Sequence, residues 1–173
     1  LTIDNVYTVF FSHMGNESSS KGESHDFHEF VYVDHGAIMA EVGPIGGPYN
    51  TVTLEQGAGD LHRPNYFHRH FVQINMRGAL CIITFQCNDT ILKRLEEEPI
   101  VLSKKQKEYL ASAMNCASHL FKGLLDTQNK FIFFRAEHCD RLMEQVFQNN
   151  LELLFLDVLC SDKRYQHGNE PIK

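Results

Sequence analysis

The stretch Glu23–Gly36, ESHDFHEFVYVDHG, decides how the first half of the chain folds. It combines histidines and acidic residues with a run of aromatic and β-branched residues, which favour strands. Alternate residues of a strand share a face. The residues expected to face one way are therefore Glu23, His25, Phe27, Glu29, Val31 and Val33.

An inward-facing Glu29 needs a compensating group. If the two valines of this strand enter the core, Glu29 and His25 enter with them, and a buried charge is costly unless it is paired. A metal ion, a polyhydroxylated ligand or a buried hydrogen-bond network would each meet that need. The stretch GAGDLHRPNYFHRH, residues 57–70, is the expected complement, because its Pro-Asn turn can bring His68 or His70 to the same place.

Composition limits the possible partners. The 173 residues suffice for one domain with a helical appendage. The chain has 16 Lys and Arg against 22 Asp and Glu, a net charge of -6, so it lacks the basic surface that a direct nucleic-acid contact needs. Five cysteines without CxxC spacing argue against a disulfide framework and favour a reducing cytoplasm. No apolar run approaches the roughly 20 residues of a membrane span, so no membrane partner is expected.

Up to about Cys87 the chain reads as short strands separated by turns rich in Gly, Pro, Asn and Ser. Strands at this spacing without intervening helices predict an antiparallel sandwich or small barrel. The candidate strands are TIDNVYTVFF, FHEFVYVDH, AIMAEVG, TVTLE, GDLHR, HFVQINM and ALCIITFQC.

The second half has helical periodicity. Ser103 and Gln106 form a capping-box signature, and the apolar spacing that follows predicts a helix to Leu124. The last long segment, residues 137–160, carries two apolar stripes, of which a small barrel can cover one. The other stripe packs on the preceding helix or meets a partner subunit. We assign dimerisation to the stripe Phe147, Leu151, Leu154 and Val158; the other consists of Met143, Val146, Leu153, Leu156 and Cys160.

Both histidine-containing stretches resemble the half-motifs of cupin barrels, and more closely those in the N-terminal ligand-binding domains of AraC-type (AraC/XylS) transcription regulators. The first half-motif is matched by His25, Asp26, Phe27, Glu29 and Gly36, and the second by Gly59, Asp60, Pro64, Asn65 and His68. The resemblance continues through PIVLSKKQKEYL, the Leu120-Phe121 pair and LELLFLDVL. Two positions depart from the pattern: Glu23 stands where many relatives have a histidine, and His28 where an aromatic residue is common.

The resemblance implies a mainly β fold with C-terminal helices, namely a cupin/jelly-roll-like antiparallel β-barrel followed by two or three α-helices. Residues 1–90 would form the ligand-binding barrel, and residues 91–162 a helical dimerisation region packed on it. Residues 163–173 would link to a helix-turn-helix domain that lies beyond this chain. DNA would then be contacted only through that absent domain.

The implied function is effector sensing by a homodimer, with no catalysis and no cofactor. A sugar or another small metabolite would bind in the barrel, in a pocket formed by His25, Phe27, Glu29, Val31, His68 and His70.

Two alternatives remain. A metal-dependent cupin enzyme would use Glu23, His25, Glu29 and His68 as ligands, a mixed set that suits Mn, Fe, Ni or Zn. A purely structural dimerisation module would instead have a polar interior that satisfies itself. Taken singly, His28, His35, His62 and His70 are more often ordinary exposed histidines at strand ends and turns than site residues.

Overall fold

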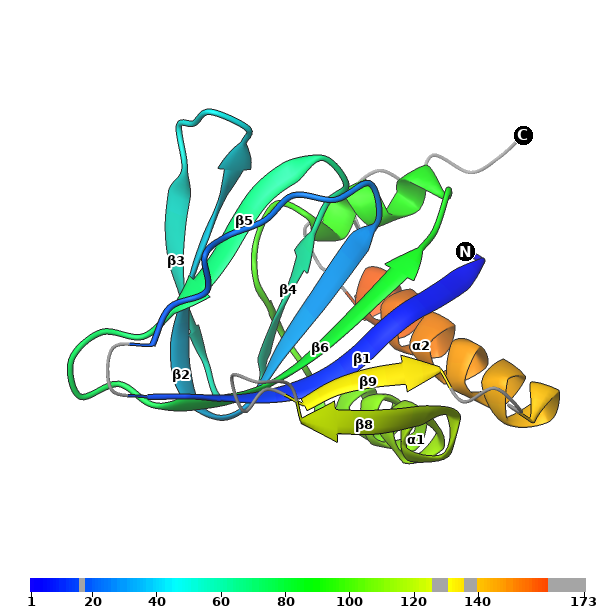
Figure 1. Cartoon of the computed structure of the whole chain (residues 1–173). Helices are drawn as coiled ribbons and strands as arrows, with labels where there is room; N and C mark the ends of the chain where they lie inside the picture. The colour runs from blue at the N-terminus through cyan, green and yellow to red at the C-terminus, as the bar shows by residue number, and fades with distance from the viewer. Residues whose placement is uncertain (16–17, 126–130, 136–139, 162–173) are drawn as a thin grey trace, which may run out of the picture.

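The computed structural model describes residues 1–15, 18–125, 131–135 and 140–161. Antiparallel strands fill the first half and two α-helices the second, so the predicted fold class is confirmed (Figure 1). In chain order the elements are β1 (Asn5–Met14), β2 (His28–Pro44), β3 (Asn50–Glu55), β4 (Ala58–His62), β5 (Tyr66–Phe71), β6 (Gly78–Gln86), the 3-10 helix η1 (Thr90–Leu95), β7 (Ile100–Val101), α1 (Lys104–Leu120), β8 (Phe121–Leu125), β9 (Phe131–Arg135) and α2 (Arg141–Ser161).

Strand β2 organises the sheet. Its first part pairs with β4 and β6, and its second part pairs with β3 and β5. The main path runs β1-β6-β2-β4-β7, and in the described residues its two end strands do not pair with each other, so the sheet is not closed. FHEFVYVDH and AIMAEVG, predicted as separate strands, are therefore one long bent strand.

The bend in β2 depends on Gly36. This residue has a φ of 73°, and a Cβ placed on it would lie 2.0 Å from the carbonyl oxygen of Arg77. Only glycine tolerates both conditions. The register against β6 shifts between Val33 and His35, next to this position. The bend thus lets β2 pair with β4 and β6 through its first part and with β3 and β5 through its second part.

The two faces of β2 enter different apolar clusters. Val31 and Val33 pack inside the barrel with residues such as Leu54 from β3. Phe30 and Tyr32 face the other way and pack with the helices. This alternation is the one that strand geometry predicts for the stretch. It places every side chain of this segment at a defined side of the sheet.

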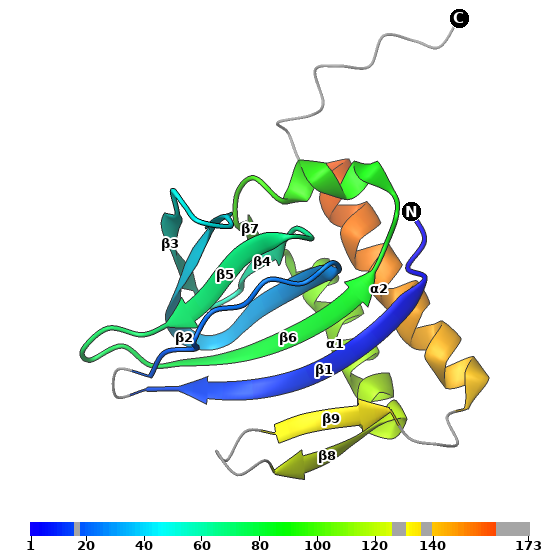
Figure 2. The same ribbon diagram turned by 45° about the horizontal axis from the view of Figure 1, so that its top comes forward.

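Helix α1 begins as predicted. The Gln106 backbone N–H donates to Ser103 Oγ at 3.3 Å, and the Ser103 N–H donates to Gln106 Oε1 at 2.8 Å. The predicted extension to Leu124 is wrong, because the helix ends at Leu120 and the chain continues as β8, paired with β9. The pairing of two strands outweighs a weak helical periodicity here. The Phe-rich β9 lies beside β1 (Figures 1 and 2).

Helix α2 packs against α1 and the outer face of the sheet (Figure 2). The predicted dimerisation stripe lies inside this contact: Phe147, Leu151, Leu154 and Val158 are between 0% and 4% exposed. That assignment is wrong, because a side chain buried in its own chain cannot also form a subunit interface. The apolar residues left exposed on α2 are Leu142, Val146, Leu153, Leu156 and Cys160.

Three further expectations can be compared with the fold. The strand predicted at residues 70–76 lies earlier, at Tyr66–Phe71, because Met76 N–H donates to Gln73 O and closes a turn where strand was expected. Residues 91–162 contain β7, β8 and β9 besides the helices. The predicted linker 163–173 lies outside the described residues.

Among the described helices, none is both long enough and apolar enough to cross a membrane.

Candidate functional site

Five ionisable side chains gather at one end of the barrel interior, and we call this cluster the polar pole. His25 precedes β2, and the other members come from β2, β4 and β5. Four of them are almost fully buried, with exposed fractions between 1% and 5%. The members are His25, Glu29, His62, His68 and His70.

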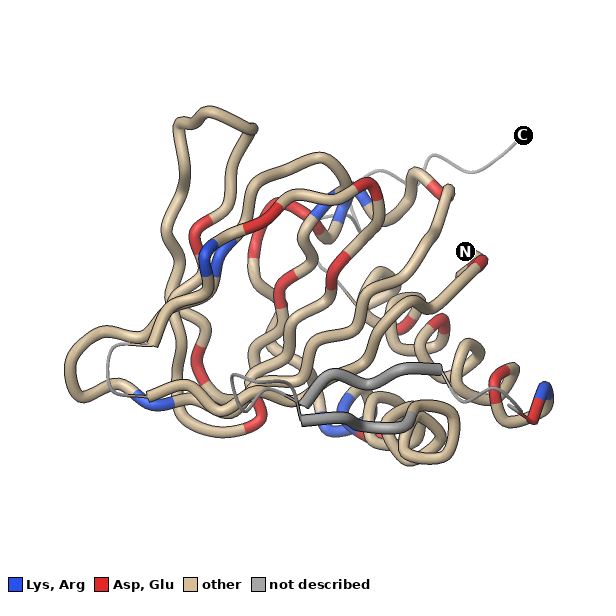
Figure 3. The backbone as a smooth tube through the Cα atoms, in the orientation of Figure 1, with Lys and Arg blue, Asp and Glu red and all other residues tan. Residues whose placement is uncertain are grey.

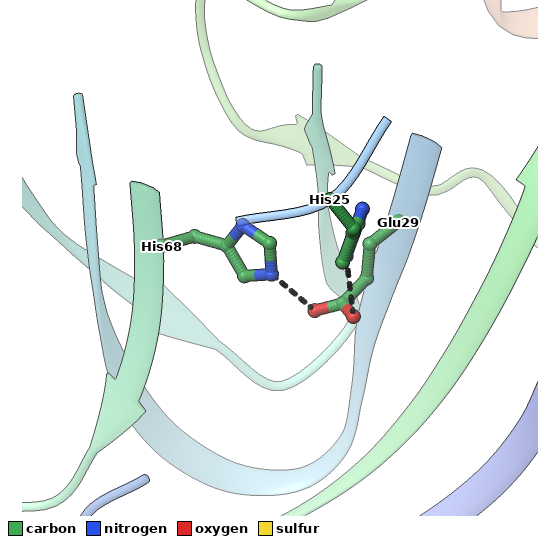
Figure 4. Close-up of side chains that lie close together, drawn as sticks. All are labelled: His25, Glu29 and His68. Atoms are coloured by element: carbon green, nitrogen blue, oxygen red, sulfur yellow. Dashed lines mark ion pairs between the residues drawn. The ribbon is translucent and has the colours of Figure 1, made fainter. Parts of the chain in front are cut away.

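Glu29 lies between two imidazoles (Figure 4). His25 Nε2 is 3.7 Å from Glu29 Oε2, and His68 Nε2 is 3.5 Å from Glu29 Oε1. These separations exceed ordinary hydrogen-bond lengths, so the attraction is mainly Coulombic. Each ring is oriented from behind by a backbone carbonyl: His25 Nδ1 lies 2.8 Å from Phe27 O and His68 Nδ1 lies 3.3 Å from Tyr66 O. In each ring Nδ1 is therefore the nitrogen placed to donate to a carbonyl, and Nε2 is the nitrogen that faces the carboxylate.

The two imidazoles favour the charged form of the Glu29 carboxylate. Burial by itself raises the pKa of Glu29, but His25 and His68 outweigh it, and the net pKa lies well below the ordinary value. Burial likewise lowers the pKa of His68, but Glu29 reverses this and the net pKa is raised. Each group thus stabilises the charged form of the other.

A second set of contacts lies on the other side of Glu29. His70 Nε2 is 4.0 Å from Glu29 Oε1 and 2.9 Å from His62 Nε2, and His62 Nδ1 is 3.5 Å from Asp60 Oδ2. Burial lowers the pKa of His62 well below its usual value and that of His70 to about 4, so both rings are neutral at pH 7. Burial also raises the pKa of Asp60, to about 6.

The segment before β2 lies along β5 and covers the polar pole. Ser20 exchanges hydrogen bonds with His70, and the backbones of Glu23 and His68 bond reciprocally at 2.9 and 3.0 Å. The side chain of Glu23 is nevertheless exposed, and neither described group of potential metal ligands includes it. The predicted four-ligand set is therefore not assembled as proposed, although His25, Glu29 and His68 do come together.

The remaining predicted pocket residues have other positions. Phe27 stacks on the ring of His25, with centroids 3.9 Å apart, and so supports that imidazole from outside. Val31 belongs to the apolar cluster of the barrel interior. His28 faces the outer side, 3.3 Å from Glu96 Oε1, and His35 is exposed.

Sequence reasoning missed His62. Its place next to a turn predicts an exposed histidine, yet its side chain is 1% exposed and lies in the polar pole. The missed signal is the alternation in GDLHR, where Asp60 and His62 are two residues apart and share a face of β4.

The donors of the polar pole fit a metal ion. Three of its buried atoms that belong to one group of potential ligands lack a hydrogen-bond partner among the described residues: His25 Nε2, Glu29 Oε1 and His68 Nε2. Imidazole nitrogens and a carboxylate are the donors that first-row divalent cations prefer. Metal-bound histidines also commonly donate their other N–H to a carbonyl, as His25 and His68 do.

Lys and Arg positions are spread over separate elements (Figure 3). The described cysteines Cys81, Cys87, Cys116 and Cys160 are free thiols, and Cys139 lies outside the described residues.

Comparison with known proteins gives a likeness to solved cupin structures alone. No family model matches the chain. No curated protein matches it either. The cupin domain of Drosophila melanogaster CENP-C is similar to this chain at 11% identity and a TM-score of 0.41, over 44% of this chain and 56% of that one. A cupin protein from Bacteroides fragilis has 13% identity and a TM-score of 0.41 (47% and 66% covered), and recombinant oxalate oxidase in complex with glycolate has 12% and 0.39 (45% and 42% covered). Likeness at this level concerns the barrel and says nothing of the chemistry at the polar pole.

Proposed function

We propose that this chain is the effector-sensing part of an AraC-type transcription regulator, with a small-molecule site at the polar pole and an output through the helices. The observation that carries the proposal is the arrangement of two adjacent residues of β2. Glu29 faces the polar pole, whereas Phe30 faces outward and packs edge-on against Phe155 of α2, with ring centroids 5.3 Å apart. A ligand that displaces Glu29 would therefore also move Phe30 and change its contact with α2.

The same coupling is present one residue earlier. His28 stacks on Phe85 at 5.5 Å and lies 3.3 Å from Glu96, which follows η1. Phe85 in turn packs against Phe155. The strand that holds the central carboxylate is thus clamped to η1 and α2. A ligand can shift the equilibrium between two arrangements of the regulator through these contacts only if it binds the two arrangements with different affinity.

The test uses the full natural reading frame. We expect it to encode two helix-turn-helix patterns after Lys173 and the product to bind DNA in a manner that depends on an added sugar, metabolite or divalent cation. Glu29→Gln should remove the ligand dependence and leave basal DNA binding, while the exposed neighbour Asp34→Asn should change neither. A frame without DNA-binding helices, or ligand dependence retained in Glu29→Gln, contradicts the proposal.

A metal-dependent cupin enzyme is the second candidate, favoured by the partnerless buried atoms of His25, Glu29 and His68. These three residues would hold the cation, which would supply Lewis acidity to a bound substrate. Elemental analysis of untagged protein tests it: about one metal per chain is expected, and the double variant His25→Ala, His68→Ala should lose it. Metal-free wild-type protein that takes up no added metal contradicts this candidate.

A further inference from the structure

The polar pole contains two groups of potential ligands rather than one. Within each group the ligand atoms lie within 4.8 Å of one another, and the two groups share Glu29 alone. The first group is His25, Glu29 and His68, the site considered above. The second is Glu29, His62 and His70, which combines β2, β4 and β5 and is buried throughout.

The second group has the distances of a ligand set. His62 Nε2 and His70 Nε2 are 2.9 Å apart. Two nitrogens that bind one tetrahedral zinc ion at about 2.0–2.1 Å would be about 3.3 Å apart, so the two rings need to separate by only a few tenths of an ångström to hold it. Without an ion, a single proton must be shared between the two nitrogens.

Groups outside the ligand set support it. The carboxylate of Asp60 lies behind His62, 3.5 Å from its Nδ1, where metal-bound histidines commonly have a carboxylate. The main chain of His70 is held on both sides by Ser20, whose N–H donates to His70 O at 2.8 Å and whose Oγ accepts from His70 N–H at 2.9 Å. The main chain that carries His70 is therefore fixed, and a carboxylate lies behind His62.

The carboxylate of Glu29 can serve both groups at once. Oε2 faces His25, whereas Oε1 faces His68 and His70. We propose that the polar pole binds two divalent cations of the zinc type, one held by His25, Glu29 and His68 and the other by Glu29, His62 and His70, with Glu29 as the bridging ligand. The second site goes beyond the proposed sensory role and does not depend on it.

Charge predicts that the two ions bind with unequal affinity. Two dications would share one bridging carboxylate, with Asp60 as the other buried carboxylate beside the second group. The second ion to enter therefore meets a repulsion that the first did not. A titration should accordingly show two separate steps.

The experiment is a zinc titration of the untagged, metal-free chain, followed by calorimetry and by elemental analysis after desalting. Wild-type protein should bind two zinc ions per chain. His62→Gln and His25→Gln should each bind one, and the exposed control His35→Gln should bind two. Circular dichroism would establish that each variant is folded.

The measured zinc stoichiometries decide whether the two-ion site exists. One zinc per wild-type chain overturns the two-ion site, and this measurement needs no variant to fold. Two ions retained in folded His62→Gln also overturn it, since the second ion would then lie elsewhere, such as on exposed histidines. One ion lost from His62→Gln and the other from His25→Gln supports it. Loss of zinc without loss of ligand-dependent DNA binding would leave the sensory proposal standing.

Discussion

The two ends of the barrel interior are built from the same strand but are stabilised differently. At one end, Val31 and Val33 pack with Leu54 and other fully buried aliphatic side chains. At the other, Glu29 is buried to the same degree but faces imidazoles at 3.5 to 4.0 Å. The apolar end is complete within the chain, whereas the polar end leaves buried atoms without partners. A barrel that needed only stability would not keep such atoms, because each costs about 1–3 kcal/mol.

The largest effect is expected at the apolar end. Leu54→Ala should lower the free energy of unfolding by about 2–5 kcal/mol, because Leu54 is 0% exposed and the truncation leaves a cavity. Chemical denaturation measures this, with the 70% exposed Ile74→Ala as the matched control, which should change stability by less than about 0.5 kcal/mol. Equal effects of both changes would show that this end is not closely packed.

The next effect belongs to the polar end. Free zinc at 100 times the dissociation constant of the tighter site should raise the free energy of unfolding of metal-free protein by about 2.7 kcal/mol from that site. Glu29→Gln should abolish most of this rise, because it removes the anionic ligand common to both groups. Thermal denaturation with and without zinc measures it. The same rise in wild-type and variant protein would place the ions away from Glu29.

A pH-dependent effect distinguishes the two ends further. Burial raises the pKa of Asp60 from 3.8 to about 6, so the folded state favours its protonated form. Stability from this group is therefore fully present below about pH 4 and is lost as the pH rises through about 6. Asp60→Asn should accordingly stabilise the metal-free protein above pH 6, by about 1–3 kcal/mol.

That gain should shrink as the pH falls from 6 towards 4 and should vanish below the unfolded-state pKa of 3.8, where Asp60 becomes protonated in both states. Denaturation curves across this range, with a chelator present, measure it. The exposed Asp34→Asn serves as the control variant. A gain that is independent of pH would mean that the carboxylate's charge is not its cause.

The strand geometry of β2 was predictable, and the assembly around it was not. Alternation alone places Glu29 with the inward valines, since a strand has a period of two. It cannot say which histidines meet Glu29, because that depends on how β4 and β5 are registered against β2. His62 was missed for this reason. On α2 both stripes are apolar in sequence, and only packing against α1 and the sheet decides that Leu154 is covered while Leu153 is not.

The smallest effect is expected at Thr84, a polar residue next to Glu29 whose hydroxyl already has hydrogen-bond partners. Thr84 lies opposite Glu29 in the β2–β6 register, and its Oγ1 accepts from Thr8 N–H at 3.0 Å and lies 2.6 Å from Thr8 Oγ1. Thr84→Val keeps the shape but removes both contacts, so it should lower the free energy of unfolding by about 1 kcal/mol. Zinc stoichiometry should stay unchanged, because this hydroxyl is satisfied within the chain. A variant that lost zinc as well would extend the site to β6 and would show that satisfied and partnerless polar groups act there as one unit.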